Sequence, residues 1–183
     1  MKHCLVIGGT GMLSGVVKHL LTSGYVVSVC AREPRKLIVD KVFEDRLNRI
    51  SVDYHNFKKL KSEVSKSVVK FGMVSLTIAW IHDTAPNLAQ QIARLDALSK
   101  RSRYLHVLGS ANANVESKGA VSAREFADLE DLDYCQVILG FVIENKQSRW
   151  LTHGEISQGV IEEIKSLKRR KIVGVVAPWS MRP

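Results

Sequence analysis

Short apolar runs alternate with longer segments of helical periodicity along the whole chain. The runs are rich in β-branched residues and occupy residues 3–8, 25–31, 49–53, 72–80, 103–110, 133–140 and 171–177. Between them, apolar residues recur every three or four positions in residues 12–22, 34–46, 56–69, 86–101, 120–130 and 152–169. Seven strands alternating with six helices are typical of an α/β protein, in which helices on both faces cover a doubly wound parallel sheet.

Local signals mark two of the helix starts, and nothing indicates a second domain. Thr152 precedes Glu155 by three residues, which is the spacing of a capping box. Pro86 suits the first turn of the helix predicted at 86–101. The sequence has no linker, repeat or low-complexity segment, and 183 residues suffice for one sizeable core but are short for two. We therefore predict a single domain over residues 1–183.

A glycine-rich stretch, VIGGTGMLSG, joins the first predicted strand to the first predicted helix. Gly8 permits the tight turn out of the strand, and Gly11 lets the backbone approach a pyrophosphate. The amides of Gly11, Met12 and Leu13 then point at an anion from a helix N-terminus, with Thr10 in the same loop. The stretch predicts a phosphate-binding loop.

This loop resembles the TGGTGxxG loop of the extended and atypical short-chain dehydrogenases/reductases, with Ser14 in place of the usual third glycine. The order of strands and helices is similar to that superfamily over nearly the whole chain. The resemblance implies a Rossmann fold with strand order 3-2-1-4-5-6-7. It also implies a nicotinamide dinucleotide cofactor.

The end of the second strand indicates which dinucleotide is preferred. An NAD-selective protein places an acidic residue there, whereas this strand ends in Cys30 and Ala31, followed by Arg32. Arg32 can hold a 2′-phosphate in a bidentate fork, and Arg35 and Lys36 add positive charge nearby. We therefore predict NADP(H). NAD(H) is the alternative if Glu33 faces the ribose, and ion pairing among these surface charges is the structural alternative.

The third strand ends at Asp53 and Tyr54. The resemblance implies that Asp53 accepts a hydrogen bond from the adenine amine and that Tyr54 lies near the base. Tyr54 and Lys58 also have the Tyr-x-x-x-Lys spacing of a dehydrogenase pair. Strands are about 4.8 Å apart, which puts the third strand roughly 19 Å from the hydride site on the fifth. We interpret the Tyr54 and Lys58 spacing as a coincidence on the adenine side.

Two further strand ends are predicted to contact the cofactor. Ala79 and Trp80 end the strand at 72–80, beside the glycine loop. Gly140 and Val142 match part of the family pattern Pro-Gly-x-Val/Ile-x-Thr, in which backbone beyond the glycine pairs with the nicotinamide carboxamide. Leu139 and Glu144 replace its proline and threonine.

The catalytic pair of the family is missing from its usual place. In that family, a tyrosine and a lysine on the helix after the fifth strand follow a serine at the end of that strand. Here Ser110 ends the strand, but no tyrosine occurs before Tyr134. The resemblance is therefore to an atypical member without that pair. Ser110, Lys118 and His82 are the groups that could handle a proton in its place.

Each of these candidates has a structural alternative. Turn formation or helix capping accounts equally well for Ser110, Asn112, Asn114 and Lys118. His82, with Asp83 next to it, can simply lead into the following helix. No acid or base in this region stands out from the sequence alone.

Composition narrows the range of partners. Lysine and arginine outnumber acidic residues by 27 to 18, giving a net charge of +9, but the charges are dispersed and no nucleic-acid module accompanies them. We interpret the densest basic cluster as the solvated end of the last helix, where cations are favourable: Lys165, Lys168, Arg169, Arg170 and Lys171. We predict no nucleic-acid partner and a possible homo-oligomer.

The three cysteines, Cys4, Cys30 and Cys135, lie far apart in apolar runs, which predicts buried thiols in a reducing compartment and no metal site. No apolar stretch of about 18 residues predicts a membrane span. A cytoplasmic protein is the expectation.

Two functions remain open. The first is an NADP-dependent oxidoreductase with a non-standard active site that acts on an unidentified small molecule. The second is a non-catalytic NADP(H)-binding protein, such as a redox sensor or a partner-binding module. Binding of the cofactor is common to both, so a vacant cleft beside the nicotinamide would discriminate between them.

Overall fold

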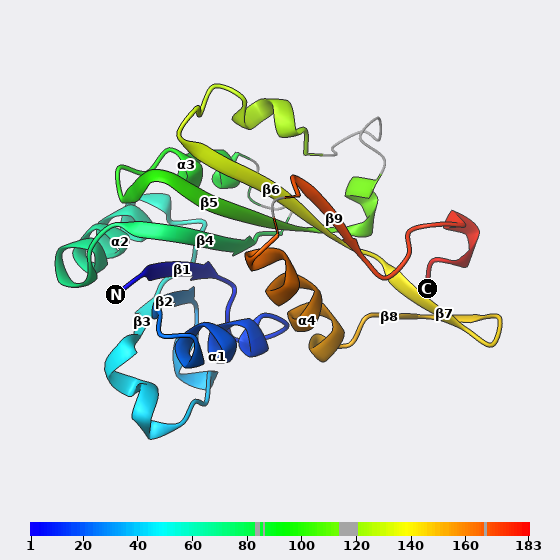
Figure 1. Ribbon diagram of the computed structural model, residues 1–183, viewed down its shortest axis with the longest axis horizontal. Coiled ribbons are helices and arrows are strands. Elements are labelled where there is room, and N and C mark those ends of the chain that lie inside the picture. Colours follow the sequence, from blue (N-terminus) through cyan, green and yellow to red (C-terminus); the bar gives the residue numbers. More distant parts are fainter. Residues whose placement is uncertain (83–84, 86, 114–120, 167) are drawn as a thin grey trace.

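A seven-stranded parallel sheet forms the centre of the computed structural model, which describes residues 1–82, 85, 87–113, 121–166 and 168–183 (Figure 1). Its strands are β1 (His3–Ile7), β2 (Val26–Ala31), β3 (Leu47–Ser51), β4 (Val74–Trp80), β5 (Leu98–Gly109), β6 (Leu132–Leu139) and β9 (Arg170–Val173). They lie in the order β3-β2-β1-β4-β5-β6-β9. The predicted fold class and strand order are confirmed, with β9 as the seventh strand.

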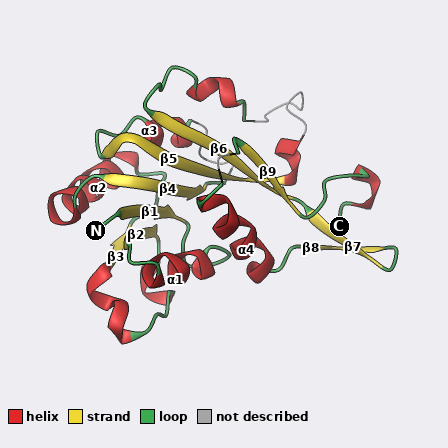
Figure 2. Cartoon of the chain, in the orientation of Figure 1, coloured by secondary structure: helices red, strands yellow, loops and turns green. Residues whose placement is uncertain are grey.

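Helices cover both faces of the sheet (Figure 2). Helices α1 (Ser14–Thr22) and α4 (His153–Ile164) pack against one face, while α2 (Phe57–Phe71) and α3 (Leu88–Ala93) pack against the other. β1 shows why the sheet is central, because all five of its residues are buried. Alternate side chains enter the two cores, with Cys4 and Val6 on the α1 face and Leu5 and Ile7 on the α2 face.

Three predicted helices are wrong in whole or in part. Residues 34–46 contain two short 3₁₀-helices instead of one α-helix. Leu37 is buried and Phe43 packs against the core, but Ile38 and Val42 are 79% and 74% exposed, so only part of the apolar pattern is buried to hold a helix. The helix predicted at 86–101 is reduced to α3, since β5 already begins at Leu98. In the described part of 120–130, Ser122 caps a 3₁₀-helix rather than an α-helix.

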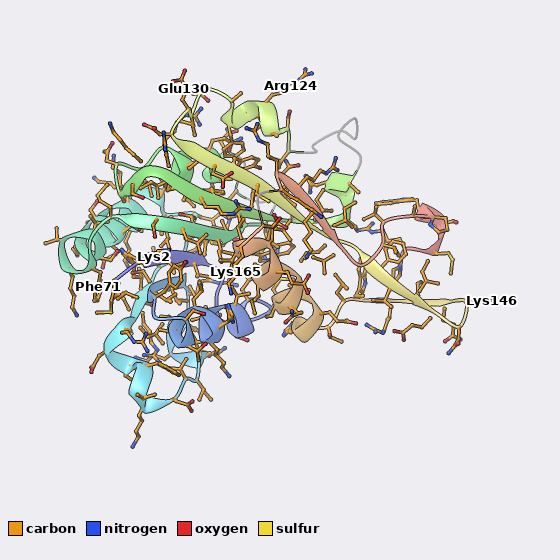
Figure 3. All side chains as sticks on the ribbon, in the orientation of Figure 1. Lys2, Phe71, Arg124, Glu130, Lys146 and Lys165 are labelled. Carbon is orange, nitrogen blue, oxygen red and sulfur yellow. The ribbon has the colours of Figure 1, made fainter. Side chains whose placement is uncertain are left out.

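An antiparallel hairpin extends beyond the sheet where the sequence predicted only a loop. Its strands are β7 (Phe141–Glu144) and β8 (Gln147–Trp150). Asn145 and Lys146 join them with φ values of 50° and 62°, the backbone of a two-residue hairpin turn. Figure 3 shows Lys146 at the tip, far from the sheet.

Helix α4 begins at the predicted capping box. Thr152 Oγ1 accepts a hydrogen bond from the Glu155 amide at 3.2 Å, and the Glu155 carboxylate accepts one from the Thr152 amide at 2.7 Å. The helix ends at Ile164 rather than 169, because the chain must turn to reach β9. The basic cluster therefore does not end the helix: its first residues follow α4 and its last two lie in β9.

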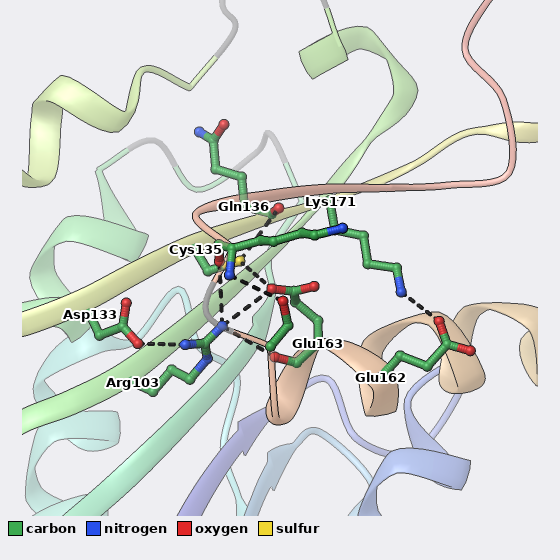
Figure 4. Close-up of polar contacts among 9 residues, drawn as sticks. Arg103, Asp133, Cys135, Gln136, Glu162, Glu163 and Lys171 are labelled. Carbon is green, nitrogen blue, oxygen red and sulfur yellow. Dashed lines mark hydrogen bonds and ion pairs between the residues drawn. The ribbon is translucent and has the colours of Figure 1, made fainter.

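A buried ion network fixes the end of α4 to the sheet (Figure 4). Arg103 of β5 forms ion pairs with Asp133 of β6 and with Glu163 of α4, the latter at 3.2 Å. The Arg103 and Glu163 side chains are only 12% and 1% exposed. The Cys135 thiol lies 3.6 Å from the same Glu163 oxygen, and burial raises the pKa of Cys135 to about 12.

No helix in the described part of the chain is both long and apolar enough to cross a membrane.

Candidate functional site

A cavity of about 370 Å³ opens at the carboxyl ends of β1, β2 and β4. The structure brings together here eight of the residues predicted to bind a cofactor: Gly8, Thr10, Gly11, Met12, Arg32, Lys36, Tyr54 and Trp80. The carboxyl edge of a doubly wound sheet, near the point where the strand order reverses, is where such folds bind their ligands.

The glycines of the loop have different roles. Gly8 has a φ of +81°, and a Cβ there would lie 3.1 Å from the Trp80 carbonyl oxygen. A Cβ on Gly9 would meet methyl groups of three buried valines at 2.9 to 3.1 Å, so this residue lets the loop settle on the sheet. A Cβ on Gly11 would meet nothing within 4 Å. The space around Gly11 is therefore open for a ligand, as predicted for a pyrophosphate loop.

The loop is also fixed from behind by α4. A Cβ on Gly15 would lie 2.7 Å from Ser157 Oγ, so only glycine lets α1 and α4 approach this closely. The Ser157 hydroxyl donates a hydrogen bond to the Met12 carbonyl oxygen at 2.8 Å. Gly15, not Ser14, thus supplies the close packing that the third glycine provides in a dinucleotide loop.

The end of β2 places one unpaired cation at the cavity. Lys36 pairs with Glu33 at 2.8 Å, so the surface ion-pair alternative holds for these two residues. Arg32 lines the cavity, and no residue in the described ranges forms a hydrogen bond or ion pair with its guanidinium. A second cavity, of about 750 Å³, adjoins it and contains Arg32, Arg35 and Arg49. Arg32 therefore lines both cavities, and its contact with a 2′-phosphate stays a prediction.

Tyr54 reaches further across the sheet than its strand position suggested. Its hydroxyl lies 3.4 Å from the His82 amide nitrogen, just beyond the end of β4. Asp53 instead accepts hydrogen bonds from the amide and the ring of His55, at 3.0 and 2.7 Å. The His55 contacts hold the pKa of Asp53 below its usual value. Contact of Asp53 with an adenine stays a prediction.

The catalytic candidates are not gathered at one point. His82 lines the cavity, where its ring makes an edge contact with Trp80 at 5.5 Å between centroids. Ser110 is buried at the end of β5, and its hydroxyl accepts a hydrogen bond from Nε of Arg182 at 3.0 Å. The Asn112 side-chain oxygen accepts a hydrogen bond from the Val121 amide at 2.8 Å, which agrees with its structural alternative. Lys118, Asn114 and Asp83 lie outside the described residues.

The remaining predicted contacts lie in the interior or elsewhere. Leu13 and Ala79 are fully buried in the two cores, so their contact with a cofactor stays a prediction. The Gly140 amide donates to the Val173 carbonyl at 2.9 Å, and a Cβ on Gly140 would collide with the Val175 carbonyl. Val142 faces a different cavity, beside α4. Contact of Gly140 or Val142 with a nicotinamide stays a prediction.

Sequence reasoning missed two residues at this edge of the sheet. His153, the first residue of α4, lines the cavity beside the glycine loop. The capping box at Thr152 located the start of this helix, but its position next to α1 becomes evident only in the fold. Arg182 was missed because it follows the last strand, where no pattern predicted a structure.

Within the described residues, no group of three His, Cys, Asp or Glu side chains could hold a metal ion.

The strand order, the glycine loop at the first turn and the cavity at the carboxyl edge define a Rossmann-like α/β fold. Solved structures share it over nearly the whole chain. A putative 3-oxoacyl-reductase from Bacillus thuringiensis has a TM-score of 0.71 at 17% identity, covering 95% of this chain and 97% of that one. The fold of this chain is thus similar to that of this structure over almost its whole length.

Two other structures carry cofactors. A short chain dehydrogenase from Burkholderia cenocepacia J2315 in complex with NADP has a TM-score of 0.68 at 14% identity, covering 94% of this chain and 96% of that one. An NADH-dependent reductase, A1-R', complexed with NAD has a TM-score of 0.65 at 16% identity, covering 95% and 94%. At these identities the likeness concerns the fold alone. No protein-family model and no curated protein matches the sequence.

Proposed function

We propose that this protein binds NADP(H) at the carboxyl edge of β1, β2 and β4 and is an oxidoreductase with a non-standard active site. The observation that carries the proposal is the guanidinium of Arg32. It lies at the cavity beside the glycine loop, where no described residue forms a hydrogen bond or an ion pair with it and only the charge of Asp53 is close enough to interact with it. An arginine fork held in this way suits a phosphate, which NADP has at the ribose and NAD lacks.

The residues present fit a dinucleotide. The open space at Gly11 and the adjoining backbone of Met12 leave room for a pyrophosphate at the start of α1. Arg32 would hold the 2′-phosphate, with Arg35 adding positive charge from the second cavity. Tyr54 and Trp80 supply aromatic walls to the first cavity. The fold's NADP and NAD complexes support a ligand of this class. When bound, the nicotinamide supplies or accepts a hydride.

The chain's own residues would handle the proton in an unusual way. Ser110 accepts a hydrogen bond from Arg182 and keeps its own hydroxyl proton for a substrate oxygen. His82 is exposed at the cavity, where its ring can hydrogen-bond to a substrate oxygen. Ser110 and His82 would together take the proton-transfer role of the missing tyrosine. The substrate is a small molecule with a reducible carbonyl or an oxidisable hydroxyl group.

Calorimetric titration of NADPH and NADH tests the cofactor. We expect NADPH to bind more tightly, and Arg32→Ala to weaken NADPH by about 1.5–3 kcal/mol while barely affecting NADH. Arg124→Ala removes the same charge from an exposed site on the far side of the sheet and serves as the control (Figure 3). Equal losses for NADPH and NADH in Arg32→Ala would refute the 2′-phosphate assignment.

The glycine loop gives a second test. Gly11→Asp puts a side chain and a negative charge into the open space beside the loop, so we expect it to abolish NADPH binding while the protein stays folded. Wild-type affinity in a folded Gly11→Asp protein would place the pyrophosphate elsewhere.

A non-catalytic NADP(H)-binding sensor is the second candidate, and one observation favours it. The family's tyrosine is absent after β5, and Ser110 is engaged by Arg182 rather than by a base. A panel of small ketones and aldehydes with NADPH discriminates between the two functions. Oxidation of NADPH that is lost in Ser110→Ala supports the enzyme. Tight cofactor binding without turnover on any of them supports the sensor.

A further inference from the structure

Arg182 is held in an aromatic clamp at the end of β5. Its guanidinium carbon lies 5.1 Å from the centre of the Trp150 ring and 4.8 Å from that of Trp179, within the range of a cation–π contact. Trp150 comes from the β7–β8 hairpin, whereas Trp179 belongs to a 3₁₀-helix that follows β9. Nε of Arg182 donates to the buried hydroxyl of Ser110. Two separate segments thus aim one cation at the candidate catalytic serine.

This cation is not neutralised. Within the described part of the chain, no carboxylate pairs with Arg182. Arg170, whose guanidinium donates to the carbonyl oxygens of Asn112 and Ala113 in the loop after Ser110, has no carboxylate partner there either. Arg149, on the same hairpin as Trp150, shows the ordinary alternative, since it pairs with two glutamates. Among the described residues, the end of β5 therefore has two arginines without a carboxylate partner.

We propose that Arg182 binds an oxyanion group of the substrate, a carboxylate or a phosphate, beside Ser110. This inference rests on the proposed function, because it takes Ser110 as part of the substrate site. It deepens that function by naming the substrate class: a carbonyl or hydroxyl compound that carries an anionic group.

The geometry suits this role. A guanidinium has a rigid fork of five N–H donors, and here only the Nε–H bonds to a described residue. The Nη atoms can then bind two oxygens of one anion. Because the indole rings restrict the fork, less conformational freedom is lost when an anion binds. Ser110, fixed by Nε, would lie next to the bound anion, so the reacting carbonyl belongs close to the anionic group.

Tryptophan fluorescence provides the test, because Trp150 and Trp179 flank the cation. We would titrate the protein with oxalate and, separately, with inorganic phosphate, both with saturating NADP and without it. Arg182→Gln and Arg182→Lys are the test variants. Lys146→Gln is the control, since it removes one positive charge from the exposed tip of the same hairpin.

We expect saturable binding of at least one anion, weakened about 10- to 100-fold in Arg182→Gln, less in Arg182→Lys and not at all in Lys146→Gln. Preference for oxalate or for phosphate identifies the group as a carboxylate or a phosphate. NADP affinity should be the same in all of these proteins. Trp179→Leu, which keeps the arginine but opens the clamp, should weaken anion binding several-fold.

Equal anion affinity in the wild type and in folded Arg182→Gln would overturn the inference, and so would no binding of either anion. Melting temperatures identify any variant that is unfolded, in which case Arg182→Lys and Trp179→Leu decide. The proposed function fails separately: if NADP does not bind but the anion does in an Arg182-dependent way, the anion site stands and the cofactor assignment falls.

Discussion

Arg103 and Arg32 are both arginines of the central sheet or next to it, yet their surroundings are opposite. Arg103, in the middle of β5, is 12% exposed and pairs with Asp133 and Glu163. Arg32, just after β2, is exposed and has no described partner for its guanidinium. The first holds the protein together, because its Nη groups are engaged by Asp133 and Glu163. The second is available, and availability beside a cavity distinguishes a binding residue from a structural one.

The same contrast extends to whole regions. Under β5 and β6, polar groups pair with each other: His106 Nδ1 lies 2.9 Å from the Tyr134 hydroxyl, and Gln136 donates to the Val121 carbonyl. At the carboxyl edge, charged and polar groups face a cavity instead. A buried polar group without a partner is costly, so most interior polar groups are paired, with Ser102 Oγ and Tyr104 Oη as exceptions, whereas a binding site must leave donors unused.

Removing Arg103 should produce the largest effect. Arg103→Ala leaves Glu163 buried and uncompensated, which we expect to lower the free energy of unfolding by about 3–5 kcal/mol. Arg32→Ala, the matched change at the open edge, should alter it by less than about 0.5 kcal/mol. Urea denaturation of both variants measures the difference. Similar losses of unfolding free energy in Arg103→Ala and Arg32→Ala would contradict the distinction between the paired interior and the open carboxyl edge.

The pH dependence of the free energy of unfolding tests a second group of the interior, the buried ring of His106. Burial lowers the pKa of His106 from its ordinary 6.5 to about 4, so the folded state keeps this ring neutral. The contribution of neutral His106 to the free energy of unfolding is complete above pH 6.5. It is lost as the pH falls toward 4, because His106 takes up a proton at a higher pH in the unfolded chain than in the folded protein. The total is about 3 kcal/mol.

The measurement compares wild type with His106→Gln from pH 8 to pH 4 by urea denaturation. The variant should lack this part of the pH slope, although carboxylates contribute to both proteins. An identical slope in the two would mean that His106 is not buried in its neutral form.

The glycine loop brings the two kinds of environment within three residues of each other. Gly9→Ala inserts a methyl group among three buried valines and should cost about 1–3 kcal/mol of stability. Gly11→Ala points a methyl group into open space and should change stability by less than about 0.5 kcal/mol. Thermal denaturation of the pair is the measurement. A larger loss in Gly11→Ala than in Gly9→Ala would reverse the roles given to these two glycines.

Tyr54→Phe should have the smallest effect. Its ring lines the cavity, and its hydroxyl makes one long contact with the His82 amide. Phenylalanine keeps the wall, so NADPH affinity and any turnover should stay within a few-fold, corresponding to less than about 1 kcal/mol. A loss of about a hundredfold in turnover, the scale of a missing general acid, would instead make Tyr54 and Lys58 a catalytic pair.

The sequence predicted the strands well because each is a buried β-branched run, and β1 is buried on both faces as such runs require. Their order came from the family resemblance of the glycine loop and of the alternating elements. It predicted the start of α4 because both hydrogen bonds of the capping box lie within four residues. Segment 34–46 was mistaken for a helix because periodicity does not reveal whether a face is covered. In the fold no element covers Ile38 and Val42.

The candidate site was predictable where it depends on local chemistry. The glycine loop and Arg32 are next to strand ends, so their place follows from the fold class. The positions of His153 and Arg182 depend instead on how distant segments pack. Arg182 reaches Ser110 over 72 positions of sequence, and no local pattern encodes such a contact.

The hydrogen bond from Ser157 to the Met12 carbonyl spans 145 positions, nearly the length of the chain. Proteins are synthesised from the N-terminus, so the glycine loop leaves the ribosome long before the hydroxyl that fixes it. A nascent chain that stops short of α4 therefore lacks both this bond and the close contact at Gly15. We expect nucleotide binding to appear late in translation, as a property of the finished polypeptide rather than of its first hundred residues.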